Sequence, residues 1–218
     1  MNIYGKIINL FFPSRCPYCD KVILFKELCC QECDNIINIE PLVNNFFTNY
    51  KKVICISAFK YENIVSEAIK SFKFGSRKMY AQQFAIVVSN AIEGEFKNIK
   101  FDCLTYVPIN FKRYLKRGFN QSALITKRMS NILNIPYKKL LFKNKDNIEQ
   151  HKLSRKNRIR NVEGVYSPIN VNYIKRKNIL IFDDIMTTGS TLKECCKVLL
   201  DNGAKEVYCA TIAAVTNY

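Results

Sequence analysis

Residues 178–192, NILIFDDIMTTGSTL, constrain the fold more than any other part of this 218-residue chain. A short apolar run ends at two adjacent carboxylates, Asp183 and Asp184, and a loop of small hydroxyl residues around one glycine follows. Behind the loop, apolar residues recur with the i, i+3, i+4, i+7 spacing of one helical face. Thr191 and Glu194 fit a capping box at the start of that helix. The stretch therefore predicts a strand, an acidic turn, a glycine-containing loop and a helix.

This loop has the composition of an anion site. Backbone N–H groups at a helix start favour an anion, and small hydroxyl residues with a glycine let a phosphate approach closely. Two carboxylates beside a phosphate suit sugar hydroxyls, or an Mg²⁺ ion that accompanies phosphates. The chain has neither G-x4-G-K-[ST] nor G-x-G-x-x-G, which excludes a P-loop and a dinucleotide-binding loop. The residues expected to hold the phosphate are Thr187, Thr188, Gly189, Ser190 and Thr191.

Strand-like runs alternate with helical spacing along most of the chain. Strands are predicted at 52–59, 101–109, 179–182 and 207–215. Helices are predicted at 64–72, 80–91, 119–133 and 191–202. The alternation predicts an α/β fold with a mostly parallel sheet flanked by helices, and ligand loops at the carboxyl ends of the strands. We expect two domains, residues 1–48 with a linker from about 40 to 50, and residues 49–218.

Half of the ten cysteines lie between residues 13 and 34. Cys16 and Cys19 form one C-x2-C pair, and Cys30 and Cys33 form a second. Such pairs in a reducing compartment indicate a tetrahedral four-cysteine zinc site. Cys29 is an alternative ligand to Cys30, although the repeated C-x2-C spacing favours Cys30. The other cysteines sit in apolar runs and are interpreted as small buried hydrophobic residues.

The charge of the chain points to anionic partners. It has 34 basic and 18 acidic residues, a formal net charge of +16, which suits nucleic acid, phosphorylated ligands or acidic lipid. No apolar stretch is long enough to predict a membrane span. The N-terminal segment carries a lysine and lacks a cleavage site, so we expect no signal peptide and a cytoplasmic location. Within it, Ile3, Ile7, Ile8 and Phe11 suit one helical face.

Two further segments are rich in cations. The segment 108–121 follows a predicted strand and holds four cations in the six positions 112–117. We expect Arg113, Arg117 and Gly118 to form a diphosphate-binding loop, with a solvated basic face as the alternative. The segment 142–166 is long, basic and weakly periodic, which is typical of a lid or binding loop, or of disorder. No catalytic role is assigned to His151, the only histidine.

These motifs resemble a known family. ILIFDDIMTTGST resembles the phosphoribosyl-pyrophosphate (PRPP) motif of type I phosphoribosyltransferases, and the whole chain is similar to the ComF family of competence-associated proteins. Five segments carry the resemblance in order: the double C-x2-C knuckle, Lys73-Phe74-Gly75, Val107-Pro108 with Arg117-Gly118-Phe119-Asn120-Gln121, Gln150 and Leu153 with Arg158 and Asn161-Val162, and 183–191. The extra Cys29 and Met186, at a variable position of the motif, are small departures.

The resemblance implies a type I phosphoribosyltransferase fold with a small N-terminal zinc-binding lobe. Asp183 and Asp184 would bind the ribose 2′ and 3′ hydroxyls, or act as the catalytic carboxylates, and 187–191 would hold the 5′-phosphate. The segment 142–166 would be a flexible lid, with Arg155 and Arg158 among its cations. The implied cofactors are structural zinc, and Mg²⁺ bound with PRPP or ribose phosphate. Any chemistry would be displacement of diphosphate from C1 of PRPP.

The resemblance favours a phosphoribosyltransferase-like protein that acts in DNA uptake during natural transformation. It would bind PRPP or ribose phosphate, single-stranded DNA and other DNA-uptake proteins. Phe111, Tyr114 and Phe119 interleave with cations as stacking platforms for single strands do, with burial in the core as the alternative for Phe119. A second hypothesis is an active Mg²⁺-dependent phosphoribosyltransferase with an unidentified acceptor. A third is that the cysteine knuckle itself contacts nucleic acid.

Overall fold

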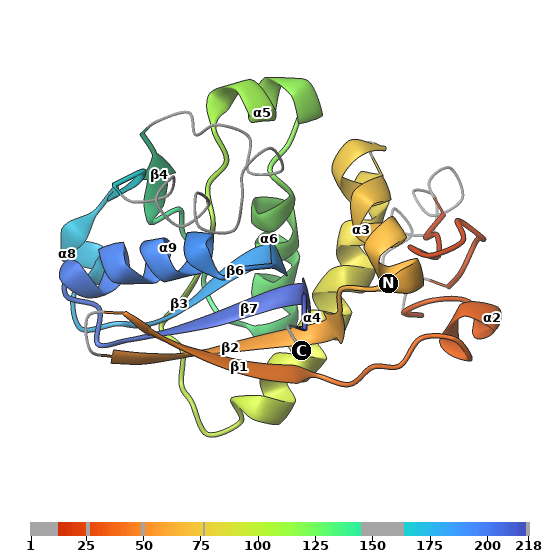
Figure 1. Cartoon of the computed structure of the whole chain (residues 1–218), viewed down its shortest axis with the longest axis horizontal. Helices are drawn as coiled ribbons and strands as arrows, with labels where there is room; N and C mark the ends of the chain where they lie inside the picture. Colours follow the sequence, from red (N-terminus) through yellow and green to blue (C-terminus); the bar gives the residue numbers. More distant parts are fainter. Residues whose placement is uncertain (1–12, 25–26, 49–50, 76, 145–163, 217–218) are drawn as a thin grey trace.

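A five-stranded sheet forms the centre of the molecule, in the strand order β1-β2-β7-β6-β3 (Figure 1). This computed structural model describes residues 13–24, 27–48, 51–75, 77–144 and 164–216. The last four strands of that order run parallel, and β1 is antiparallel to β2. The predicted α/β fold with a mostly parallel sheet is therefore confirmed. The strands are β1 Leu42–Thr48, β2 Lys51–Lys60, β3 Cys103–Tyr106, β6 Asn178–Met186 and β7 Glu206–Ala214.

Helices cover both faces of the sheet because its inner strands are apolar on both sides. In β6, Leu180 and Phe182 face one core cluster, which includes apolar residues of α3, α4 and α6. Ile179 and Ile181 face the other cluster, which is covered mainly by α9. The five cysteines outside the knuckle region are all buried, as expected of small hydrophobic residues. The helices are α2 Gln31–Asp34, α3 Asn63–Phe74, η1 Lys78–Tyr80, α4 Ala81–Glu95, α5 Phe111–Arg117, α6 Gln121–Leu133, α8 Val171–Ile174 and α9 Ser190–Asp201.

Two segments differ from the sequence-based expectation. Residues 42–48, expected to lie in a linker, form the edge strand β1, because Leu42 and Phe46 pack against the core cluster on the α9 side of the sheet. Residues 111–117, expected to be a loop, form the helix α5. The side chain of Asn110 caps α5 by accepting from the N–H of Arg113, and Gly118, with a φ of 74°, ends it. The division of the chain into domains at residue 48 stays a prediction.

A small second sheet stands beside the main one. It pairs β4, Leu141–Lys143, with the antiparallel β5, Tyr166–Pro168. The amide of Asn144 also donates to the carbonyl of Val165 at 2.8 Å. Most of the segment expected to be a lid, including Arg155, Arg158 and His151, lies outside the described residues. The expected helical face at residues 3–11 also lies outside them.

The N-terminal lobe consists of the cysteine knuckle and α2. Cys16, Ile23 and Cys33 form a small apolar core, against which Tyr18, Ile37 and Ile64 pack. Figure 1 shows this lobe, in red and orange, beside α3. Within the parts of the chain that the structure describes, no helix is long and apolar enough to cross a lipid bilayer.

Candidate functional site

A cavity of about 560 Å³ opens at the carboxyl ends of β3 and β6. Elements far apart in sequence line it: the end of α3, the chain after β3, α5, the small second sheet and the loop from β6 into α9. The structure thus brings together the predicted carboxylates, phosphate loop and diphosphate-loop arginines. The predicted residues that line the cavity are Arg113, Arg117, Asp183, Asp184, Thr187, Thr188, Gly189, Ser190 and Thr191. Gly118 is not among the lining residues.

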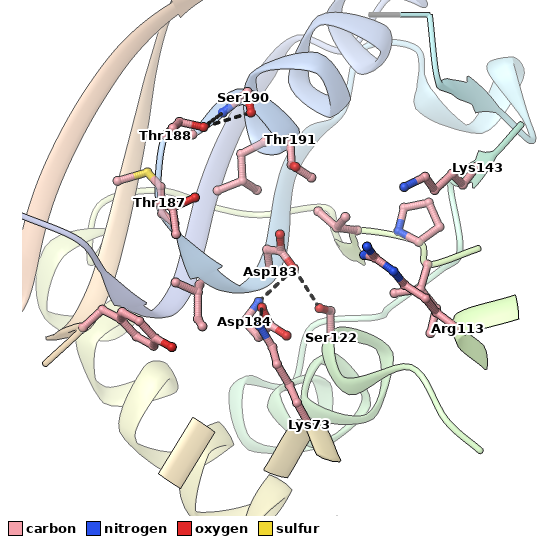
Figure 2. Close-up of a pocket in the computed structure, with 18 of the residues that line it drawn as sticks. Lys73, Arg113, Ser122, Lys143, Asp183, Asp184, Thr187, Thr188, Ser190 and Thr191 are labelled. Carbon is pink, nitrogen blue, oxygen red and sulfur yellow. Dashed lines mark hydrogen bonds and ion pairs between the residues drawn. The ribbon is translucent and has the colours of Figure 1, made fainter. Parts of the chain in front are cut away.

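The two carboxylates lie within β6 and not in a turn after it. The strand continues to Met186 because β7 pairs with it as far as Ala214. Consecutive strand residues point to opposite faces, so Asp183 and Asp184 meet different partners. Asp184 is 9% exposed, and its Oδ1 lies 2.8 Å from Nζ of Lys73. Oδ1 of Asp183 accepts from the hydroxyl of Ser122 at 3.0 Å and from the N–H of Asp184 at 2.9 Å (Figure 2).

Asp183 is poised near its titration point at neutral pH. Burial, and after it the negative charge of Asp184, raise the pKa of its carboxyl to about 7. The ammonium of Lys73 and the hydrogen bonds from Asp184 and Ser122 act in the opposite direction. A divalent cation or sugar hydroxyls at this position would favour the charged carboxylate. The pair is therefore suited to binding a cation or a polyhydroxy ligand.

The loop after β6 leads into α9 as an anion site requires. Gly189 has a φ of 70° and occupies the N-cap position of α9, where it has no side chain to accept from the first-turn N–H groups. The hydroxyls of Thr188 and Ser190 lie 3.0 Å apart and hydrogen-bond each other. The helix start is thus suited to a phosphate that accepts from its N–H groups.

The predicted capping box is wrong. The helix begins at Ser190, so Thr191 lies inside its first turn and is not the N-cap. The carboxylate of Glu194 accepts instead from the N–H of Gly164 at 2.8 Å. Glu194 therefore links the chain before β5 to α9. The second sheet packs next to that helix.

Five cations line the cavity against the two carboxylates, so its charge favours a polyanion. They are Lys70, Lys73, Arg113, Arg117 and Lys143. The guanidinium of Arg117 lies 5.1 Å from the centre of the Phe74 ring and donates to Oε1 of Gln121 at 3.2 Å. Burial lowers the pKa of Arg117, and the positive charge of Arg113 lowers it further, whereas Asp184 raises it. These contacts hold the cation in place before any ligand binds.

The Arg-Gly-Phe-Asn-Gln motif joins three elements around the site. Asn120 caps α6 by accepting from the N–H of Ala123, and its amide donates to the carbonyl of Val107. Gln121 donates to the carbonyl of Lys73 at 3.3 Å. The ring of Phe119 lies 5.7 Å from that of Phe72 in the core. Phe119 is 8% exposed, so its predicted role as a stacking platform is wrong and the core alternative holds.

Sequence reasoning gave no individual role to Lys73, Ser122 or Lys143. Lys73 lies on α3, more than a hundred positions before the carboxylate that it pairs with. The Lys-Phe-Gly segment marked this lysine in the family resemblance, but the pairing depends on how α3 packs against β6. No pattern marked Ser122, which is buried in the structure, and Lys143 was only one of several cations in the segment 142–166 that was expected to be a lid.

The four cysteines Cys16, Cys19, Cys30 and Cys33 form a cluster that fits a zinc ion. Their Sγ atoms all lie within 4.8 Å of one another. Tetrahedral Zn–S bonds of about 2.3 Å place ligand sulfurs about 3.8 Å apart. A hydrogen bond from the backbone N–H of Cys33 lowers the pKa of Cys30 to about 7, which favours the thiolate that binds metal.

The structure also decides between Cys29 and Cys30. The thiol of Cys29 points to Asp34, with Sγ 3.6 Å from Oδ1, whereas Sγ of Cys30 lies 3.4 Å from that of Cys19. Burial, and then the charge of Asp34, raise the pKa of Cys29 to about 12. Cys30 therefore belongs to the cluster, and Cys29 does not.

Comparisons with known proteins agree with this architecture. Residues 121–217 match the family model described as "Phosphoribosyl transferase domain". Competence protein F of Haemophilus influenzae is 27% identical over 88% of this chain and 82% of its own. Competence protein ComFC of Bacillus subtilis is 26% identical over 67% of this chain and 58% of its own. DNA utilization protein YhgH of Escherichia coli K12 is 33% identical over 49% of this chain and 46% of its own.

The sheet, the carboxylate pair and the loop into α9 define a phosphoribosyltransferase-like protein with the type I fold. A four-cysteine cluster, of the kind that holds a structural zinc, precedes that fold. Together with the competence and DNA utilization proteins that it is similar to, this architecture supports a ComF-family, phosphoribosyltransferase-like protein.

Proposed function

We propose that this protein acts in DNA uptake during natural transformation, binding a phosphoribosyl ligand in the cavity and single-stranded DNA on its basic surface. The names of its relatives, two competence proteins and a DNA utilization protein, support the biological role. The observation that carries the ligand is the cavity in which two carboxylates and an open helix start face five cations. The proposal places the protein in the cytoplasm, with other DNA-uptake proteins as partners.

The proposed ligand is PRPP or ribose phosphate with Mg²⁺. The loop 187–191 would hold the 5′-phosphate at the start of α9, and Asp183 and Asp184 would bind the ribose hydroxyls or the metal ion. Arg113 and Arg117 would bind the diphosphate, as charge-assisted hydrogen bonds from guanidinium groups do. Lys73 lies on the same side of the cavity as Asp184 and adds a further cation for the diphosphate.

The single-stranded DNA site is proposed on α5, at the rim of the cavity. This helix has no buried residue. Phe111 is 72% exposed and Tyr114 is 49% exposed, and both alternate with cations. Exposed aromatic rings among cations bind single strands by base stacking and phosphate contacts.

The DNA site is tested with a double variant that combines Phe111→Ala and Tyr114→Ala, compared with wild type. Fluorescence anisotropy with labelled oligothymidine should show binding that weakens steeply with added salt. The double variant should lose about tenfold or more in affinity, because each stacked base contributes roughly 1–3 kcal/mol. Phe47→Ala is the matched control, since Phe47 is 62% exposed on β1, away from α5. Salt-insensitive binding, or equal affinity in all three proteins, would contradict the DNA site.

An active phosphoribosyltransferase is the second candidate. It is favoured by the intact carboxylate pair and phosphate loop around one open cavity. Incubation with PRPP, Mg²⁺ and candidate acceptors distinguishes the two. Diphosphate release that depends on one acceptor and is abolished by Asp184→Asn would favour the enzyme. Ligand binding without release would favour a sensor or scaffold.

A further inference from the structure

The cysteine lobe packs against the helix that carries two of the cavity's cations. Ile64, in the first turn of α3, packs against the lobe's apolar core together with Tyr18. The ring of Tyr18 also meets that of Phe59, near the end of β2, at 6.4 Å and 84°. The N-terminal end of α3 is therefore in contact with the lobe.

Asp20 links the same lobe to the segment after the other end of α3. Its carboxylate accepts from Nη1 of Arg77 at 2.5 Å and from the hydroxyl of Tyr80 at 2.8 Å. Asp20 follows the ligand Cys19, and its N–H donates to the carbonyl of Cys16 at 2.9 Å. Its φ of 65° is uncommon for a residue other than glycine. The position of the Asp20 carboxylate is thus set by the turn that presents the first two zinc ligands.

Helix α3 carries Lys70 and Lys73 to the cavity. Nζ of Lys73 lies 2.8 Å from Asp184, so a small movement of the helix would alter both the cation and the carboxylate that a ligand meets. On the side away from the lobe, the side-chain amide of Gln121 donates to the carbonyl of Lys73, and the guanidinium of Arg117 lies over the ring of Phe74. The lobe and the Arg-Gly-Phe-Asn-Gln motif therefore hold α3 from two sides.

We propose that the cysteine lobe, through Asp20, positions α3 for anion binding in the cavity, so that zinc in the knuckle strengthens the binding of a diphosphate-bearing ligand. The ligand class rests on the proposed function, and the positioning role extends it. Asp20 is a positioning residue, since it acts through Arg77 and Tyr80 and lines no part of the cavity. Because coupling between two sites is reciprocal in binding free energy, bound ligand also strengthens the binding of zinc, so that a chelator removes less zinc at equilibrium.

The test uses Asp20→Asn in the full-length zinc-loaded protein. Asparagine tolerates the left-handed backbone of this position and keeps a hydrogen-bond acceptor, but it removes the charge that faces Arg77. Glu32→Gln is the matched control, because Glu32 lies in the same lobe and its carboxylate pairs with Lys21 of that lobe at 2.6 Å. Three quantities are measured: bound zinc, calorimetric affinity for inorganic diphosphate with Mg²⁺, and hydrogen exchange of the amides of α3.

The expected result is retained zinc, a loss of about tenfold in diphosphate affinity and faster exchange in α3 for Asp20→Asn, with Glu32→Gln like wild type. Wild-type affinity and wild-type exchange in Asp20→Asn would overturn the proposal. Should Asp20→Asn lose zinc, a double variant with Arg77→Gln and Tyr80→Phe removes the same contacts from outside the lobe. Unchanged diphosphate affinity and unchanged α3 exchange in that double variant would overturn the proposal. A wild type that binds neither diphosphate nor ribose 5-phosphate would refute the proposed ligand, while exchange in α3 would still decide the positioning role.

Discussion

Two adjacent carboxylates with different partners are the chemical centre of the site. Asp184 is paired with Lys73, whereas Asp183 has hydrogen bonds from Ser122 and a backbone N–H. The difference follows from the alternation of a β-strand, which sends successive side chains to opposite faces. Asp184 is thus already paired with an ammonium, whereas Asp183 is left to be neutralised by a proton or by a bound cation.

The raised pKa of Asp183 gives the ligand-free protein a defined pH dependence. Its carboxyl has a pKa of about 7 in the folded protein, against an ordinary value of 3.8. The folded state thus keeps a proton that the unfolded state releases, so stability from this group is present below the ordinary value and is lost as pH rises to about 7. Asp183→Asn should be more stable than wild type at about pH 8, by up to roughly 4 kcal/mol for a pKa raised from 3.8 to about 7, and the gap should close towards about pH 4.

Thermal unfolding across that pH range checks this prediction. Ser122→Ala serves as the companion variant, because it removes a hydrogen bond that lowers the pKa of Asp183 and should shift the transition to higher pH. A pH-independent difference between Asp183→Asn and wild type would show that folding does not raise the pKa of Asp183.

The loop into α9 is the element whose geometry makes the anion site. Gly189 has a left-handed backbone, and a Cβ there would meet only Met186 at 3.8 Å, an ordinary contact. Gly189→Ala should therefore cost about 1 kcal/mol of stability from backbone strain alone. It should also weaken calorimetric binding of ribose 5-phosphate, because the loop is displaced from the helix start.

Gly203→Ala is the control for this element. Gly203 follows the opposite end of α9, also with a positive φ, and a Cβ there would lie 3.2 Å from Lys175. The control should lose stability but keep its affinity for ribose 5-phosphate. Equal losses of affinity in both variants would mean that the effect comes from general destabilisation of α9.

For individual helices and strands, the sequence was informative where local pattern and tertiary packing agree. The continuous apolar run of β6 predicted a buried strand, and the 3.6-residue spacing predicted α3, α4, α6 and α9. The extension of β6 through Asp183 to Met186 was missed because pairing with β7, not local composition, determines it. Helix α5 was missed because its charged residues suggested a loop, whereas the Asn110 cap and Gly118 define a short helix.

The whole molecule combines the cavity and the four-cysteine cluster, two features that composition alone could only suggest. The net charge of +16 predicted anionic partners, but the meeting of α3, α5 and the second sheet at one cavity depends on long-range packing. The C-x2-C spacing predicted the metal cluster, since four thiols at that spacing close on one ion. The contact of Asp20 with Arg77 and Tyr80 has no sequence pattern, because it joins residues more than fifty positions apart.

The central claim is that the cavity binds a phosphoribosyl ligand with Mg²⁺ through the β6 carboxylates. Calorimetric titration of PRPP into wild type and Asp184→Asn, with and without Mg²⁺, tests it most directly. Asp102→Asn is the control, because Asp102 pairs with Lys177 and does not line the cavity. We predict Mg²⁺-dependent binding to wild type and Asp102→Asn, weakened about tenfold or more in Asp184→Asn. Absence of binding to wild type, or equal affinity in Asp184→Asn, would contradict the claim.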